Sequence, residues 1–178
     1  MILNQNESII LIIDIQEKLL KSVFNRDLVE RKSKILVEAA KILDVPIFVT
    51  EQYPQGLGET IVGLKDKAFV YEKTSFNALE DENLLQQLQK CAKKQIVVFG
   101  IETHICVHQT VASLISAGFD VTLVKDACGS RSEIEYDAGI FCMKENGAKI
   151  KTVEMVLFEW LKSSKHPNFR EIQNLIKN

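Results

Sequence analysis

The chain has 178 residues, 46% hydrophobic and 26% charged, which fits one globular domain with a sizeable core over residues 1–178. A net charge of −2 excludes a strong attraction to nucleic acid or to an anionic membrane, so neither is expected as a partner. The apolar run at residues 9–13 is too short for a membrane span or a signal peptide, which favours a cytoplasmic protein. The four cysteines show no paired spacing, so neither a disulfide framework nor a zinc ribbon is indicated.

Apolar runs alternate with helical patterns along the chain. Strands are predicted at residues 8–14, 45–50, 68–71, 96–99, 119–124 and 148–153. Helices are predicted at residues 28–43 and 84–91, after Thr103, at residues 133–146, and twice near the C-terminus, the last of them opened by Pro167. This alternation predicts an α/β three-layer sandwich, in which helices cover both faces of a six-stranded parallel, Rossmann-like sheet. Residues 51–67, with Pro54 and two glycines, are the best candidate for a binding loop or lid.

The most informative turn follows the fourth strand. Gly100 ends an apolar run, Thr103 is the expected N-cap, and Cys106 falls in the first turn of the next helix. Unpaired N–H groups and the helix dipole would bias such a thiol toward the thiolate. A buried core cysteine is an equally good interpretation of the position alone.

Two further reactive side chains follow predicted strands. In open α/β sheets, ligands bind at the carboxyl ends of the strands, where the strand order reverses. With the common order 3-2-1-4-5-6, Asp14 and Cys106 would flank one crevice, and Lys73 follows the third strand. Taken singly, Asp14 could belong to a capping box at residues 14–17, and Lys73 could be a solvated lysine.

Three segments together resemble the isochorismatase-like cysteine hydrolases. They are residues 12–16 (IIDIQ), 73–78 (KTSFNA) and 100–107 (GIETHICV), and residues 126–131 (DACGSR) resemble the family's loop after the fifth strand. Residues 51–54 (EQYP) and 166–169 (HPNF) are most similar to the subgroup named isochorismatase domain-containing proteins. The likeness covers nearly the whole chain.

The resemblance implies a catalytic triad of Asp14, Lys73 and Cys106. Asp14 would accept and return the thiol proton, while Lys73 would hold the charged forms. It also implies a cis peptide between Ile101 and Glu102, with the N–H groups of Glu102 and Cys106 forming an oxyanion hole. The expected reaction is hydrolysis of an amide, carbamoyl or ester bond of a small molecule through an acyl thioester. Candidate substrate-binding residues are Gln16, Gln52, Tyr53, Leu57 and Phe76.

No metal or other cofactor is expected. Nicotinamidase-like members of the family place Asp and His metal ligands after the second strand, but residues 49–73 contain no histidine. His104 and His108 are spaced for one helix face, whereas Cys106 would point the opposite way, so the histidines are interpreted as surface or pocket-rim groups. Cys106 also argues against the vinyl ether chemistry of true isochorismatases, which do not use this cysteine.

Two other classes of function stay open. A thiol-redox or peroxide-responsive protein could use Cys106, with Cys128 as its resolving partner. A non-catalytic scaffold that binds a partner is the second alternative. A homo-oligomer, a dimer or tetramer, is expected because Phe158, Trp160 and Phe169 suggest an interface, although these rings could equally cover the sheet.

Overall fold

A computed structural model describes residues 2–80 and 82–177. Its six strands form one parallel sheet in the order β3-β2-β1-β4-β5-β6, which confirms the predicted α/β fold and strand order. The strands are Ser8–Ile13 (β1), Ile47–Gln52 (β2), Phe69–Lys73 (β3), Gln95–Ile101 (β4), Asp120–Gly129 (β5) and Lys149–Lys151 (β6).

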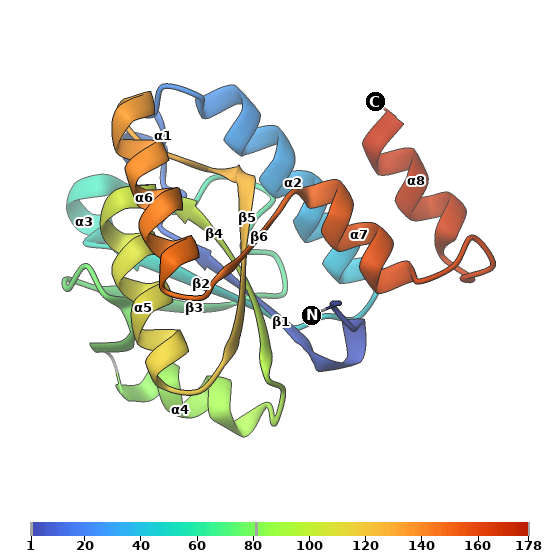
Figure 1. Ribbon diagram of the computed structural model, residues 1–178. Helices are drawn as coiled ribbons and strands as arrows, with labels where there is room; N and C mark the ends of the chain where they lie inside the picture. The colour runs from blue at the N-terminus through green and yellow to red at the C-terminus, as the bar shows by residue number, and fades with distance from the viewer. Residues whose placement is uncertain (1, 81, 178) are drawn as a thin grey trace.

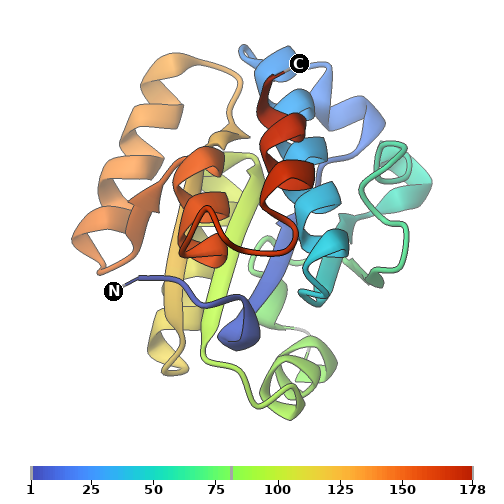
Figure 2. The same cartoon turned by 90° about the vertical axis from the view of Figure 1, so that its right-hand side faces the viewer.

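Helices cover both faces of this sheet (Figure 1). They are Glu17–Leu20 (α1), Arg26–Ile42 (α2), Pro54–Leu57 (α3), Glu82–Lys90 (α4), His108–Ser116 (α5), Glu133–Glu145 (α6), Val153–Leu161 (α7) and Phe169–Lys177 (α8). Helices α2 and α7 pack on one face with α8 outside them, as Figure 2 shows, and α5 and α6 cover the other. Among the described residues, no helix is long and apolar enough to cross a membrane.

The core is centred on β1 and β4, which are neighbours in the middle of the sheet. All six residues of β1 are buried, as expected for a parallel strand with helices on both sides. Trp160 of α7 is also buried, and its Nε1 donates a hydrogen bond of 3.0 Å to Ser8 Oγ. Phe158 packs edge-to-face on Phe169, with ring centroids 6.3 Å apart. Trp160 therefore covers the sheet rather than offering a surface to a partner.

Strand β5 is longer than predicted and runs to Gly129. Its register with β4 shifts between Val98, which pairs with Leu123, and Gly100, which pairs with Cys128. The extra residues form a bulge. The predicted strand stopped at residue 124 because the apolar run ends at Val124. This extension brings the end of β5 beside the turn that carries Cys106, where Thr103 Oγ1 donates a hydrogen bond to the carbonyl of Gly129.

Candidate active site

The turn after β4 places Cys106 near the carboxyl ends of the central strands. Gly100 is required there, because its φ is +142° and an added Cβ would lie 2.1 Å from the carbonyl oxygen of Ile13. The peptide bond from Ile101 to Glu102 is cis. The predicted N-cap is wrong: Glu102 is the N-cap, and Thr103 lies inside the first turn.

That first turn, Thr103–Val107, is π-helical rather than α-helical. The N–H of Val107 donates to the carbonyl of Glu102, five residues earlier, at 3.3 Å. The turn continues directly into α5, so the Cys106 side chain is held at the start of a longer helix. Cys106 is 6% exposed.

Asp14 follows β1 and is completely buried in a left-handed backbone conformation, with φ +51°. Its carboxylate accepts two short hydrogen bonds, from Thr50 Oγ1 to Oδ1 at 2.6 Å and from Lys73 Nζ to Oδ2 at 2.7 Å. The capping-box interpretation is wrong, because Gln16 is the N-cap of α1 and the Asp14 side chain is engaged elsewhere. Thr50, which holds Asp14, was missed; the available signal was a polar residue that closes the apolar run of the strand predicted at residues 45–50.

Lys73 ends β3 with its side chain only 3% exposed. Besides its bond to Asp14, Nζ donates to Gln52 Oε1 at 2.6 Å and to the carbonyl of Ser75 at 3.1 Å. A fourth, longer contact of 3.4 Å reaches the carbonyl of Phe76, so all three donors of the ammonium group are engaged, which offsets the cost of burying its charge. The interpretation of Lys73 as a solvated lysine is therefore wrong.

The Cys106 thiol is close enough to Asp14 and Lys73 for both to act on its pKa through charge and hydrogen bonding. Burial and, after it, the Asp14 carboxylate raise this pKa, Lys73 lowers it, and the net result is a pKa raised to about 12. Burial therefore outweighs the bias toward the thiolate that the helix position alone would give. With an ionised Asp14–Lys73 pair beside it, deprotonating Cys106 would leave a net negative charge in a buried site.

A pocket of about 250 Å³ opens above Cys106. Its walls are mostly apolar and come from α1, the end of β2, α3, the segment after β3 and the π-helical turn. The lining residues are Leu19, Gln52, Tyr53, Leu57, Phe76, Glu102, Ile105 and Cys106. Four of the five candidate substrate-binding residues line this pocket, and sequence reasoning missed the apolar wall residues Leu19 and Ile105.

Gln16 does not line the pocket but lies behind its wall, fully buried. Its Nε2 donates to the carbonyls of Gln52 and Gly58 at 3.0 and 2.6 Å, and its Oε1 accepts from the N–H of Gln52 at 2.7 Å. The side-chain amide thus joins β2 to the segment after α3. The hydrogen bonds of Gln16 therefore support the pocket wall.

Glu102 lines the same pocket and forms a two-pronged ion pair with Arg131, which follows β5. Arg131 Nε donates to Oε1 at 3.0 Å and Nη2 donates to Oε2 at 2.8 Å. The hydrogen bonds from Arg131 hold the pKa of the Glu102 carboxyl below its usual range. Glu102 is therefore ionised at neutral pH.

His104, two residues before Cys106, is not among the residues that line the pocket. His104 Nδ1 lies 3.0 Å from Ser130 Oγ, and its Nε2 lies 3.6 Å from a carboxylate oxygen of Glu135 on α6. Within residues 2–80 and 82–177, no three His, Cys, Asp or Glu side chains are grouped to hold a metal ion.

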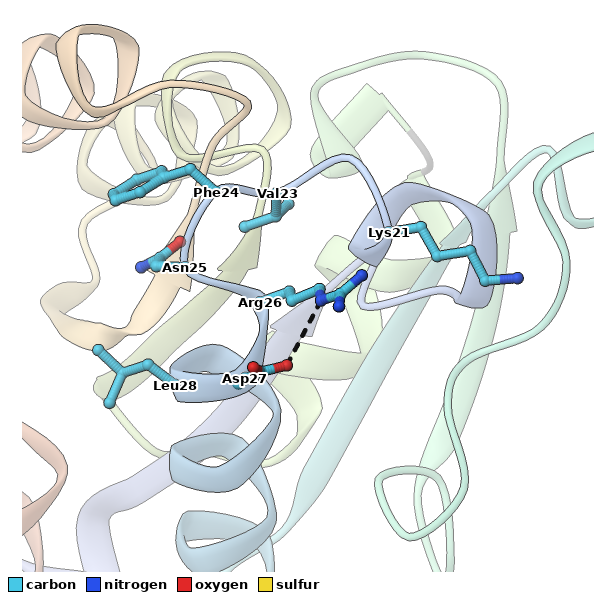
Figure 3. Close-up of a pocket in the computed structure, with 7 residues that line it drawn as sticks. All are labelled: Lys21, Val23, Phe24, Asn25, Arg26, Asp27 and Leu28. Carbon is cyan, nitrogen blue, oxygen red and sulfur yellow. Dashed lines mark ion pairs between the residues drawn. The ribbon is translucent and has the colours of Figure 1, made fainter.

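A second hollow, of about 430 Å³, lies between α1 and the start of α2 (Figure 3). It is lined by residues 21 and 23–28, and its charged groups include Arg26 and Asp27, whose Nε and Oδ1 are 3.4 Å apart. Although it is larger, it contains neither the cysteine nor the buried ion pair. The pocket above Cys106 is therefore the candidate active site.

Comparison with known proteins agrees with this architecture. Residues 8–155 match the isochorismatase domain family. Isochorismatase domain-containing protein 2 from Xenopus laevis is 40% identical over 98% of this chain and 85% of its own length. The structure of MAR1 ribonuclease from Caenorhabditis elegans is 33% identical, with a TM-score of 0.93 over 100% of this chain and 93% of that one. The YcaC product of Escherichia coli, described as an octameric hydrolase of unknown specificity, is 26% identical, with a TM-score of 0.89 over 99% and 95% of the two chains. The chain belongs to the isochorismatase domain family of hydrolase-like proteins.

Proposed function

We propose that this protein is a cysteine-dependent hydrolase that cleaves an amide, carbamoyl or ester bond of a small molecule through an acyl thioester on Cys106. The observation that carries the proposal is the buried Asp14–Lys73 ion pair, which lies beside a cysteine at the base of a largely apolar pocket. Burying two charges is costly, and an arrangement of this kind is typical of functional sites.

In the first step, the Cys106 sulfur attacks the substrate carbonyl while its proton passes to Asp14. The raised pKa of Cys106 favours this coupled transfer over attack by a preformed thiolate. Before the step, Asp14, Lys73 and the thiol carry no net charge. After it, the protonated Asp14, the Lys73 ammonium and the new oxyanion again sum to zero, so no uncompensated charge is buried.

The oxyanion would be stabilised by backbone N–H groups of the turn after β4. The N–H groups of Glu102 and Cys106 are the proposed donors, because both belong to the turn that carries the nucleophile. Collapse of the intermediate breaks the bond to the leaving group, which takes the proton from Asp14 and leaves the acyl thioester. Water then attacks the thioester, gives a proton to Asp14 and releases the acid, and the Cys106 thiol recovers its proton.

The ribonuclease activity named for the Caenorhabditis elegans relative is not carried over to this chain. RNA binding depends on cations that meet phosphates, whereas Glu102 is the one charged residue among those described as lining this pocket. The redox alternative is weakened by the surroundings of Cys128. That thiol is fully buried and its pKa is also raised to about 12, which makes a poor resolving group.

Assembly into a homo-oligomer remains a proposal. Helix α6 carries Ile134 and Phe141 with 81% and 64% of their surfaces exposed, and large exposed apolar side chains of this kind are common at interfaces. Light scattering at micromolar concentration should give a mass above that of one chain. A strictly monomeric mass would contradict the proposal.

The function is tested by trapping the acyl enzyme. The protein is incubated with a library of small amides, carbamoyl compounds and esters, quenched in acid, and its intact mass is measured. The expected result is an added acyl mass that maps to Cys106 and disappears in Cys106→Ser, together with release of the acid. Turnover of a confirmed substrate by Cys106→Ala would contradict the proposal.

A further inference from the structure

Glu102 differs from the other residues around the candidate site. Among the described residues that line the pocket, it alone carries a charge, and five of its seven neighbours there are Leu, Ile, Phe or Tyr side chains. Only 10% of the Glu102 side chain is exposed. A carboxylate at the wall of such an apolar pocket acts on a bound group with little screening from water.

Arg131 orients this carboxylate without entering the pocket. The Arg131 side chain is 64% exposed and does not line the pocket. Its guanidinium nevertheless donates a hydrogen bond to each carboxylate oxygen of Glu102. Each oxygen has a second lone pair, so Glu102 can still accept a hydrogen bond from a group in the pocket. The fork fixes the direction of the carboxylate and keeps it ionised.

We propose that Glu102 sets the charge specificity of this site: it rejects anionic substrates and favours neutral or cationic carbonyl compounds that carry an N–H donor. Arg131 is the positioning residue that holds Glu102. This inference rests on the proposed function, because it assumes that the reacting carbonyl binds above Cys106. The substrate class it names is a compact, mainly apolar amide, ureide or amino ester without a carboxylate.

The test compares a neutral and an anionic reagent of similar size, iodoacetamide and iodoacetate, and needs no turnover. Alkylation rates are measured by peptide mass spectrometry at Cys106 and, in the same sample, at the exposed Cys142. The neutral-to-anionic rate ratio at Cys106 is divided by the ratio at Cys142, which removes the intrinsic difference between the reagents. The expected quotient for the wild type is roughly ten. The negative charge of Glu102, partly cancelled by Arg131, should disfavour iodoacetate in the pocket by about that factor.

Glu102→Gln keeps the shape of the side chain but removes its charge, and should bring the quotient to one or below. Arg131→Gln should lower the quotient toward that of Glu102→Gln, because the carboxylate loses the two hydrogen bonds that orient it and keep it ionised. Glu82→Gln is the matched control: it changes the net charge equally at an exposed position on α4 and should leave the quotient unchanged.

Two results would overturn the proposal. A wild-type quotient of one or less would mean that Arg131 attracts anions instead. A high quotient that survives Glu102→Gln would assign the selection to another group. Loss of hydrolysis in Asp14→Asn reports on the proposed function, whereas the labelling quotient reports on Glu102, so the failure of one is distinguishable from the failure of the other. Once a substrate is known, kcat/KM for a neutral and a carboxylate-bearing analogue should differ by the same roughly tenfold factor.

Discussion

Cys106 follows β4 and Cys128 lies near the end of β5, and their thiols are alike in burial and in the direction of their pKa shifts. Both are buried, and burial raises the pKa of each to about 12. The difference lies in their neighbours. Asp14 and Lys73 act on Cys106, which also borders a pocket, while Asp126 and the backbone of Gly100 act on Cys128 inside the core. A buried cysteine becomes a candidate nucleophile when a proton acceptor and an open space adjoin it, and burial alone does not distinguish the two.

The largest effect that would sharpen this comparison is expected from Asp14→Asn. Removing the proton acceptor should lower kcat on a confirmed substrate by roughly 10²- to 10⁴-fold. The same variant should alkylate faster with iodoacetamide, because the Asp14 charge raises the pKa of Cys106 while Lys73 lowers it. Steady-state kinetics and labelling should therefore move in opposite directions. Slower labelling together with slower turnover would indicate a damaged site rather than a missing base.

Lys73→Met tests whether the ion pair is what sets this region apart. The substitution leaves the Asp14 carboxylate buried without its cation, and breaking a buried pair in this way costs about 3–5 kcal/mol of unfolding free energy. Urea denaturation measures the loss. The double variant Asp14→Asn/Lys73→Met should recover much of it, because both charges are then gone.

Lys90→Met, at an exposed position in the last turn of α4, is the control and should change stability by less than about 0.5 kcal/mol. If Lys73→Met were as mild as this control, the pair would not be a strongly coupled buried feature.

The pH dependence of Cys106 labelling separates a resting thiol from a resting thiolate. Because its pKa is raised to about 12, the thiolate fraction at Cys106 should grow about tenfold per pH unit from pH 7 to pH 10. The iodoacetamide rate, followed by mass spectrometry, should rise with the same slope. If the labelling rate instead reached a plateau near pH 6 or 7, Cys106 would already be a thiolate there, as helix position alone predicts.

These tests address what the sequence could not convey. The positions of the strands were predictable because apolar runs mark them, and the common order 3-2-1-4-5-6, which the structure has, puts Asp14 and Cys106 beside one crevice. The place of Lys73 next to Asp14 was implied by the resemblance to the family rather than by the strand pattern. The charge state of Cys106 was not predictable. It depends on how deeply the thiol is buried and on the sign of its neighbours, which are properties of tertiary packing.

Two local features also escaped the sequence analysis for physical reasons. Thr103 has the side chain of an N-cap, but its hydroxyl bonds to Gly129 across the sheet, so a tertiary contact outweighs the local preference. Gln16 lies next to the reactive region in sequence, yet its amide is used to fix the backbone of the pocket wall. Polar residues near a site can bind the ligand or build the site, and the sequence does not separate these roles.

The smallest expected effect is that of Cys128→Ala, which removes the buried thiol that the proposed mechanism does not use. Removing the sulfur of a fully buried side chain leaves a small cavity and should lower the unfolding free energy by about 1 kcal/mol. Turnover should stay within about twofold of the wild type, because the groups around Cys128 have no part in the proposed proton transfer. Denaturation and steady-state kinetics, with Cys142→Ala as the exposed control, measure both quantities. A loss of peroxide-dependent or thiol-dependent activity in Cys128→Ala, with hydrolysis unaffected in Cys106→Ala, would reverse the assignment and make the two cysteines a redox pair.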